Sequence, residues 1–222
     1  MSDISIQPLA LLSFGLLLGL RHAADPDHVV AIGAIAARTR RLWPAARLGM
    51  VWGLGHTLTL FMVASGITVF NWVIPPRLGL GMEFCVALAL VVLGLANLDP
   101  RGHDRAAKWR GIGSSRRAFL VGLVHGLAGS AAVALLVVST VREPLWACAY
   151  LLVFGVGTLL GMTLITAGFA LPVAMAAHRW HSGDRAIRLA TGGLSVALGV
   201  WLVYHIGWND GLFLATPNWT PR

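Results

Sequence analysis

The stretch LRHAADPDH, residues 20–28, decides how this chain folds. It lies inside an apolar run, residues 7–37, that exceeds the roughly 20 residues a helix needs to cross a bilayer. Pro26 has no N–H to donate, and its ring clashes with the carbonyl of His22. The residue before a proline is pushed out of the helical region. The sequence therefore predicts a membrane helix that is broken at Asp25-Pro26.

The ionisable groups of this stretch are expensive to hold inside a membrane. Each charged side chain at mid-bilayer costs at least about 2.5–3.5 kcal/mol on insertion scales. A cytoplasmic loop between two short helices is one alternative, but the flanks 8–20 and 29–37 are too short to span separately. With the break, Asp25 can cap the second half-helix and Asp27 can turn inward. The freed carbonyls of the first half-helix also suit a cation, so we interpret the stretch as functional.

The composition is that of an integral membrane protein. Of the 222 residues, 57% are hydrophobic and 12% are charged, whereas a soluble domain has about 25% charged residues. We predict an all-α fold with six transmembrane helices in a single membrane domain, residues 1–222. The predicted spans are 7–37, 47–74, 79–98, 117–140, 145–177 and 187–207. The two cysteines are isolated, which argues against a disulfide scaffold.

Basic residues are unevenly distributed between the loops. The loops 38–46, 99–117 and 178–186 hold most of the Lys and Arg residues. Because basic loops stay in the cytoplasm, we predict a multi-pass protein of the cell inner membrane with both termini outside. A net charge of +8 would suggest nucleic acid in a soluble protein, but membrane orientation explains it here. We therefore expect a lipid bilayer, and no nucleic acid, as partner.

Short segments recur in the same order in the two halves of the chain. The matching pairs are GLRH 19–22 with GLVH 122–125, WGLG 52–55 with FGVG 154–157, and VALAL 86–90 with VALGV 196–200. Three spans in each half force the second half to run opposite to the first, as in the inverted repeats of many secondary transporters. We predict a first repeat at about 7–98, a cytoplasmic loop at about 99–116, a second repeat at about 117–207 and an outside tail at 208–222.

Pairs of glycines spaced four residues apart mark four of the six spans. They are Gly15 and Gly19, Gly49 and Gly53, Gly122 and Gly126, and Gly157 and Gly161. Such pairs permit close approach of membrane helices. We therefore expect the first, second, fourth and fifth spans to form the central bundle.

Two further histidines are expected at the depth of the broken helix. At about 1.5 Å per residue, His56 and His125 lie roughly 12–14 Å from the cytoplasmic edges of their spans. His22 falls in the same slab of a core about 30 Å thick. A lone buried histidine is more often a core residue than a ligand, but three at matching depth beside two carboxylates indicate a binding site.

The residue types favour a transition metal. Imidazole and carboxylate suit Ni, Co, Cu(II) or Zn, whereas Ca and Mg prefer oxygen alone. The predicted metal ligands are His22, Asp25, Asp27, His28, His56 and His125. The predicted polar path consists of Thr57, Ser130 and Thr158, although hydroxyls in membrane helices usually bond back to the backbone.

The motif HAADPDH, residues 22–28, resembles the signature of the nickel/cobalt transporter family, His-Ala-x-Asp-x-Asp-His. LGHT at 54–57 resembles that family's second motif, a Leu-Gly-His-Ser/Thr run. The resemblance implies a permease that binds metal through His22, Asp27 and His28 of the first motif. It adds His56 from the second motif.

This chain also departs from typical members of that family. They have eight spans, and the six predicted here resemble the shorter urease-accessory-type branch, whose His-Gly-Leu-x-Gly-Ser run is similar to residues 125–130. Acidic residues of later helices are missing around Ala128 and Thr166. Efflux relatives have a long His-rich loop, whereas the loop 99–117 holds one histidine, which favours uptake.

Together these observations predict a secondary permease, not an enzyme, that takes up nickel or cobalt through the His/Asp site of the broken helix. No P-loop is present, so we expect no ATP site, and no permanent cofactor beside the transported Ni²⁺ or Co²⁺. An exporter of metal or of another small solute stays open as an alternative. So does a membrane metalloenzyme in which a histidine-bound metal works with Asp25 or Asp27 as base. A homo-oligomer and a cytoplasmic metal-delivery partner also stay open.

Overall fold

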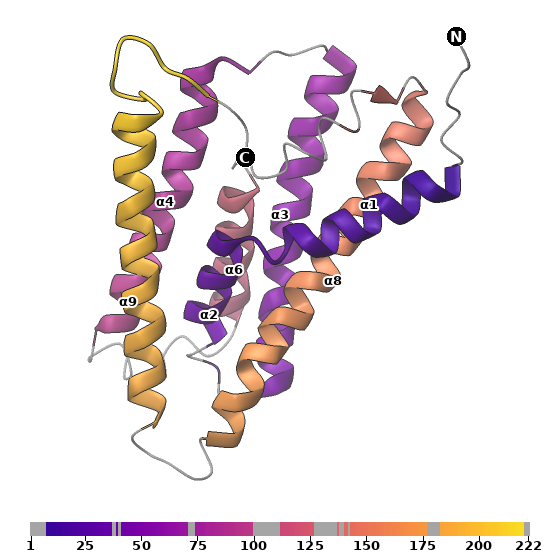
Figure 1. Ribbon diagram of the computed structural model, residues 1–222. Helices are drawn as coiled ribbons and strands as arrows, with labels where there is room; N and C mark the ends of the chain where they lie inside the picture. Colours follow the sequence, from indigo (N-terminus) through magenta and orange to yellow (C-terminus); the bar gives the residue numbers. More distant parts are fainter. Residues whose placement is uncertain are drawn as a thin grey trace.

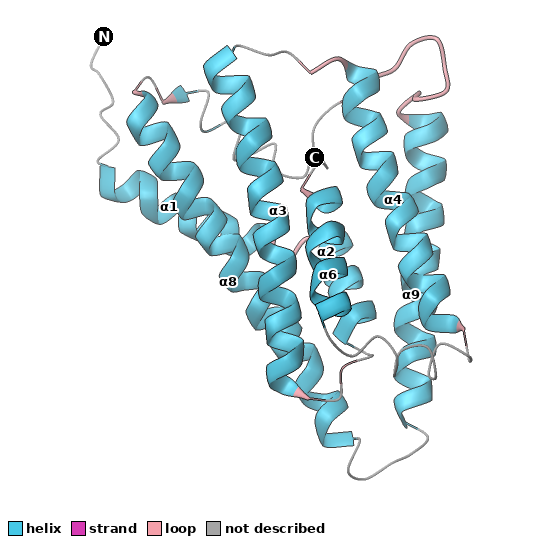
Figure 2. Cartoon of the chain, turned by 180° about the vertical axis from the view of Figure 1, so that it is seen from behind, coloured by secondary structure: helices cyan, strands magenta, loops and turns pink. Residues whose placement is uncertain are grey.

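The computed structural model of the chain describes residues 8–36, 39, 41–70, 74–99, 112–126, 137, 140, 141, 143–176 and 183–219. Within these residues the regular elements are all helical (Figures 1 and 2). The helices are α1 (Pro8–His22), α2 (Pro26–Ala36), α3 (Leu42–Phe70), α4 (Pro76–Leu98), α6 (Ile112–His125), α8 (Pro144–Ala176) and α9 (Gly183–Tyr204), which continues into a π-helical turn, His205–Asn209. The predicted all-α class is confirmed.

The predicted break in the first apolar run is present. Helix α1 ends at His22, and tight backbone bonds close its last turn, from Ala24 N to Arg21 O at 2.9 Å and from Asp25 N to His22 O at 3.1 Å. Helix α2 then begins at Pro26, which sits at a first position where a missing N–H costs nothing. The steric effect of one proline therefore produces two short helices whose facing ends lie close together.

Among the residues that the structure describes, four helices are long and apolar enough to cross a membrane. Their spanning segments are Leu42–Gly66, Pro76–Leu98, Leu145–Leu171 and Arg185–Asn209. Helices α1 and α2 are shorter apolar helices, so the first predicted span is two elements and not one continuous crossing. The fourth predicted span is described only for α6 and a few later positions. The chain is therefore a multi-pass membrane protein, but six crossings are not confirmed.

The helices pack in pairs. Helix α1 lies along α8, α6 lies along α3, and α3 also packs against α8, while α4 and α9 form a separate pair. The short helix α2 contacts α8 on one side and α4 and α9 on the other. Figures 1 and 2 show α2 and α6 between the α4–α9 pair and the remaining helices. Helix α2 thus joins the two parts of the bundle.

Glycines set the closeness of these pairs. A Cβ atom on Gly19 would meet the backbone of Phe154 in α8, and a Cβ atom on Gly122 would meet the backbone of Trp52 in α3. Helices can approach this closely only where no side chain intervenes. The predicted glycine pairs of the first, second, fourth and fifth spans do lie at contacts among α1, α3, α6 and α8, as expected for a central bundle.

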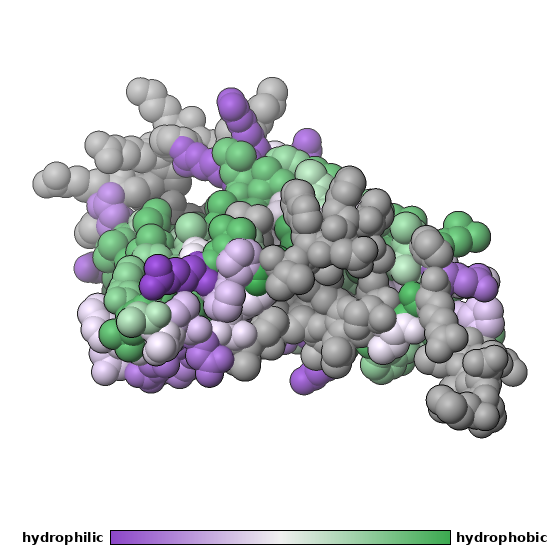
Figure 3. All heavy atoms as spheres, turned by 90° about the horizontal axis from the view of Figure 1, so that it is seen from above, coloured by the Kyte–Doolittle hydropathy of each residue, from purple (hydrophilic) through white to green (hydrophobic). Residues whose placement is uncertain are grey.

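The interior and the outer surface differ in the usual way for a membrane protein. Large side chains such as Trp52, Tyr150 and Phe154 are fully buried, whereas many leucines, for example Leu17 and Leu152, are exposed. Seen from above, hydrophobic side chains cover much of the visible surface between hydrophilic ones (Figure 3). Exposed leucines suit contact with lipid, so the core that positions the site is made of helix–helix contacts.

Candidate metal centre

Three buried histidines meet where the first helix is broken. His22 is the last residue of α1, His28 lies in the first turn of α2, and His56 lies in the middle of α3. One nitrogen from each ring lies within 4.8 Å of the other two. Their exposed fractions are 4%, 0% and 1%. We refer to His22, His28 and His56 as the histidine triad.

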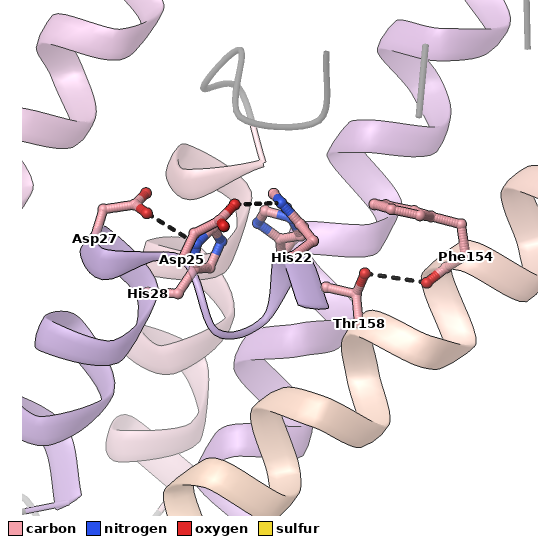
Figure 4. Close-up of polar contacts among 7 residues, drawn as sticks. His22, Asp25, Asp27, His28, Phe154 and Thr158 are labelled. Atoms are coloured by element: carbon pink, nitrogen blue, oxygen red, sulfur yellow. Dashed lines mark hydrogen bonds and ion pairs between the residues drawn. The ribbon is translucent and has the colours of Figure 1, made fainter. Parts of the chain in front are cut away.

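The break accounts for the first two members of the triad. Between α1 and α2 the chain turns within three residues, so the end of one helix faces the start of the next (Figure 4). The ring centroids of His22 and His28 are 4.7 Å apart, with the rings edge to face. A continuous helix would have placed the two rings along one side with Asp25 between them. His56 completes the group at 4.9 Å from His28.

Each helix-end histidine is held by a neighbouring carboxylate. The Nδ1 atom of His22 lies 2.9 Å from Oδ2 of Asp25, and Nδ1 of His28 lies 3.1 Å from Oδ1 of Asp27 (Figure 4). Because an ionised carboxylate only accepts, Nδ1 of each ring carries the proton and donates it, which leaves Nε2 with a lone pair. This carboxylate–histidine arrangement is the one that orients histidine ligands in metal sites.

The remaining nitrogens of the triad are directed at one another or have no partner. Nε2 of His22 lies 3.0 Å from Nε2 of His56. Among the described residues, Nε2 of His28 and Nδ1 of His56 are buried without a hydrogen-bond partner. Buried nitrogens that lack partners are costly, and a cation would satisfy them.

The carboxylates are the accessible part of the site. The side chain of Asp25 is 33% exposed and that of Asp27 is 17% exposed, whereas the triad is buried behind them. An ionised carboxylate is costly to expose to lipid, so an exposed carboxylate here needs water or a cation as a partner. With the imidazoles neutral, the two carboxylates give the site a charge that a divalent cation would balance, which lowers the cost of burial.

His125 lies beside the triad but is not part of it. It is the last residue of α6, is fully buried, and donates from Nδ1 to the carbonyl of Val121 at 3.3 Å. Its ring centroid is 5.8 Å from that of His28. The six predicted ligands therefore lie in one region, but they divide into three clustered histidines, two carboxylates that hold histidine rings, and one adjacent histidine.

The hydroxyls predicted for a polar path bond to the backbone. Thr158 donates to the carbonyl of Phe154 at 3.0 Å within α8 (Figure 4), and Thr57 donates from α3 to the carbonyl of Gly155 at 3.3 Å. Ser130 lies outside the described residues. The Thr158 bond stays within one helix, which is the common pattern for hydroxyls in membrane helices, whereas the Thr57 bond joins α3 to α8.

Two aromatic residues of the site were not identified from the sequence. Phe154 packs 5.5 Å from the ring of His22, and Trp52 packs 5.8 Å from His28 and 5.2 Å from His125. Trp52 precedes His56 by four residues, and Phe154 precedes Thr158 by four. Residues with this spacing lie on the same helix face. This spacing indicates that both residues are neighbours of the site, although the sequence analysis uses them only as evidence for the internal repeat.

Comparison with known proteins agrees with the site. Residues 8–98 match the family model described as a high-affinity nickel-transport protein, NicO. The chain is 33% identical over 219 residues to the urease accessory protein UreH of Bacillus sp. (strain TB-90), which covers 92% of this chain and 95% of that relative. No solved structure matches.

These matches settle one of the alternatives drawn from the sequence. The resemblance seen in residues 22–28 is confirmed, and the reading of the chain as a membrane metalloenzyme is not retained. Because identity extends over nearly the whole length of both chains, this chain belongs to the NicO family of nickel-transport proteins and is a membrane transporter.

Proposed function

We propose that this protein is a secondary permease that takes up a divalent transition metal, nickel in preference to cobalt, through the histidine triad. The observation that carries the proposal is the position of the triad. Three buried ring nitrogens lie within 4.8 Å of one another at the junction of two half-helices that are each too short to cross the membrane. Broken helices are where secondary transporters bind their substrates.

The choice of nickel rests on the family match and on the donor types. Residues 8–98 match the model of a high-affinity nickel-transport protein, and imidazole donors suit nickel. The 3.0 Å between the Nε2 atoms of His22 and His56 is the length of an ordinary hydrogen bond between two rings. It brings two donor atoms together but does not by itself select a metal.

In this proposal the carboxylates orient ligands and supply charge. Asp25 and Asp27 bind the Nδ1–H groups of His22 and His28, so the Nε2 lone pairs point away from the carboxylates. The carboxylates also meet an arriving cation first, because they are the exposed part of the site. Asp25 and Asp27, which the sequence suggested as direct ligands, thus act mainly through the histidines.

The scaffold that we propose is an inverted repeat of about 7–98 and about 117–207 in one membrane domain. Its support is a set of reciprocal contacts. Gly19 packs against the backbone of Phe154 and Thr158, and Gly122 packs in the same way against Trp52 and His56. In the alignment of the two halves, Gly19 corresponds to Gly122, Phe154 to Trp52 and Thr158 to His56. The first contact therefore corresponds to the second. Figure 1 shows α4 and α9 running in opposite directions, as an inverted repeat requires.

The contacts between α4 and α9 favour a different alignment of the two halves from the one that the sequence match gives. Gly94 packs against Gly192 and Val196, and Gly199 packs against Ala87 and Val91. These contacts are reciprocal only if Gly94 corresponds to Gly199, which aligns 91–95 with VALGV at 196–200. Segments rich in Val, Ala and Leu can be aligned in several ways. The sequence alone therefore could not separate this alignment from the one at 86–90.

We further propose that both termini lie outside the inner membrane, with the loop 99–116 and tail 208–222 on opposite sides. The relative is named a urease accessory protein. A protein that assists an enzyme has reason to supply metal to it, which supports uptake, and a metal-delivery protein would be its partner in the cytoplasm. A homo-oligomer is compatible with the same scaffold.

The test is uptake of radioactive nickel by cells that express wild type, His22→Ala or His205→Ala at equal levels in the membrane. We expect His22→Ala to lose at least about nine-tenths of the uptake. His205→Ala is the matched control, because its ring lies after α9 and packs on Trp201, away from the triad. Equal uptake by wild type and His22→Ala would remove the proposal, and nickel entry into inverted vesicles would reverse its direction.

A further inference from the structure

His125 holds the position in the second half of the chain that His22 holds in the first. His22 follows Gly19 by three residues and packs on Phe154, and His125 follows Gly122 by three residues and packs on Trp52. The ring-centroid distances are 5.5 Å and 5.2 Å. The alignment of the two halves that relates the glycine contacts therefore also relates His22 to His125.

His125 also has the protonation pattern of a ligand. Its Nδ1–H is taken by the carbonyl of Val121, so Nε2 carries the lone pair, as it does in His22. That Nε2 atom is buried, and among the described residues it has no hydrogen-bond partner. The lone pair has lost its water without a replacement, which is unfavourable unless something else binds it.

His28 lies between the two related histidines. Its ring centroid is 4.7 Å from that of His22 and 5.8 Å from that of His125, and it meets both rings edge to face. His28 belongs to α2, a half-helix that follows a short turn. The ring of His28 is therefore a direct neighbour of both related histidines.

We propose that His28 and His125 form a second, transient position for the same divalent cation, to which the triad hands it during transport. This inference rests on the proposed function and deepens it. His22 ends α1 and His125 ends α6, whereas His28 is carried by α2, which packs less extensively on its neighbours than the long helices pack on one another. A shift of α2 would move His28 from one histidine toward the other.

The second position holds the cation less tightly. The triad offers three imidazoles and has two carboxylates nearby, Asp25 on His22 and Asp27 on His28. When the cation moves to His125, the His22–Asp25 pair is left behind, and only Asp27 remains to balance the charge. A weaker site after a tighter one is what release requires.

The test compares equilibrium binding with transport in purified protein, using Ni²⁺ itself as the probe. The variant is His125→Phe, which keeps a ring of similar size beside Trp52 but removes Nε2. We expect its Kd for Ni²⁺ in lipid nanodiscs to stay within about threefold of wild type. Uptake of Ni²⁺ into proteoliposomes should fall at least tenfold. His22→Ala should lose both binding and uptake.

Two outcomes overturn the proposal. Uptake by His125→Phe at the wild-type rate means that no second position is needed. A loss of binding as large as that of His22→Ala means that His125 is a ligand of the triad site. His125→Asn repeats the comparison with a smaller side chain if His125→Phe fails to fold. Wild-type protein that takes up no Ni²⁺ would instead contradict the proposed function, so the two failures are distinguishable.

Discussion

The Nε2 atoms of His22 and His56 lie 3.0 Å apart, although one residue ends α1 and the other lies in the middle of α3. The Nδ1 proton of His22 is committed to Asp25, so the short contact depends on a proton from His56. A divalent cation can take the place of this proton once the proton moves to Nδ1 of His56, which has no hydrogen-bond partner among the described residues. The metal-free contact therefore brings two ligand atoms together before the cation arrives.

The donor set predicts the coordination of the bound ion. Protein loaded with Co²⁺ is expected to show the weak d–d absorption of five- or six-coordinate cobalt, because the three imidazoles leave positions that water or the nearby carboxylates can fill. Visible spectroscopy of the purified protein measures this directly. Intense bands typical of tetrahedral cobalt would contradict the geometry, and His56→Ala should remove the spectrum in either case.

Removing the charge of a carboxylate should weaken binding without unfolding the protein. Asp27→Asn keeps an oxygen that can accept from Nδ1 of His28 but loses the negative charge. We expect the affinity for Ni²⁺ to fall by about 10–100-fold, as for other groups that orient histidine ligands. Isothermal titration calorimetry measures the change. An affinity equal to wild type would show that Asp27 does not act on the metal.

The glycine contacts predict opposite effects of the same substitution. Gly19→Ala places a Cβ atom against the backbone of α8 and should lower the melting temperature by several degrees. Gly168→Ala is the matched control, because a Cβ atom there meets nothing within 4 Å. In a helix it should be neutral or stabilising by up to about 1 kcal/mol. Similar melting temperatures for the two variants would argue against the close α1–α8 contact.

Two buried hydrogen bonds of equal length allow effects on stability to be distinguished from effects on metal binding. Asn97 in α4 donates to the carbonyl of Ala34 in α2, and Ser195 in α9 donates to the carbonyl of Leu90 in α4, both at 2.7 Å. Loss of the Asn97 bond should cost about 1–3 kcal/mol, because the carbonyl of Ala34 lies in the last turn of α2 and has no partner within that helix. Loss of the Ser195 bond should cost about 0.5–1.5 kcal/mol, because the carbonyl of Leu90 keeps its partner within α4.

Only one of the two bonds holds the helix that carries His28. Asn97→Ala is therefore expected to weaken Ni²⁺ binding as well as stability, whereas Ser195→Ala should lower stability alone. Calorimetry and thermal melting of both variants make the comparison. Equal Ni²⁺ affinities in the two variants would show that α2 does not depend on Asn97 for its position.

The broken helix and its histidines could be predicted because their causes are local. Pro26 acts within four residues of itself, and the cost of ionised groups in a membrane applies wherever they stand. His56 entered the prediction through its depth alone. That argument located it in a slab but could not place its Nε2 atom beside His22.

Which side chains would bind metal and which would orient a ligand could not be predicted in this way. Sequence spacing does not show which carboxylate oxygen meets which ring nitrogen, so it cannot tell a carboxylate that binds metal from one that orients a histidine. His125 matched the triad in depth, but its distance from the triad depends on how α6 packs against α3. The register of α4 and α9 was similarly hidden, because several alignments of apolar residues score alike.

The two carboxylates of the proposed site would also determine how the transporter responds to voltage. With neutral imidazoles, the triad loaded with a divalent cation would carry no net charge, whereas the empty one would carry two negative charges. Each charge that crosses the membrane field contributes about 2.3 kcal/mol per 100 mV. At the proposed second position, where Asp25 stays behind, the ion would keep one uncompensated positive charge. A negative cell interior would therefore draw the cargo inward at the hand-over itself.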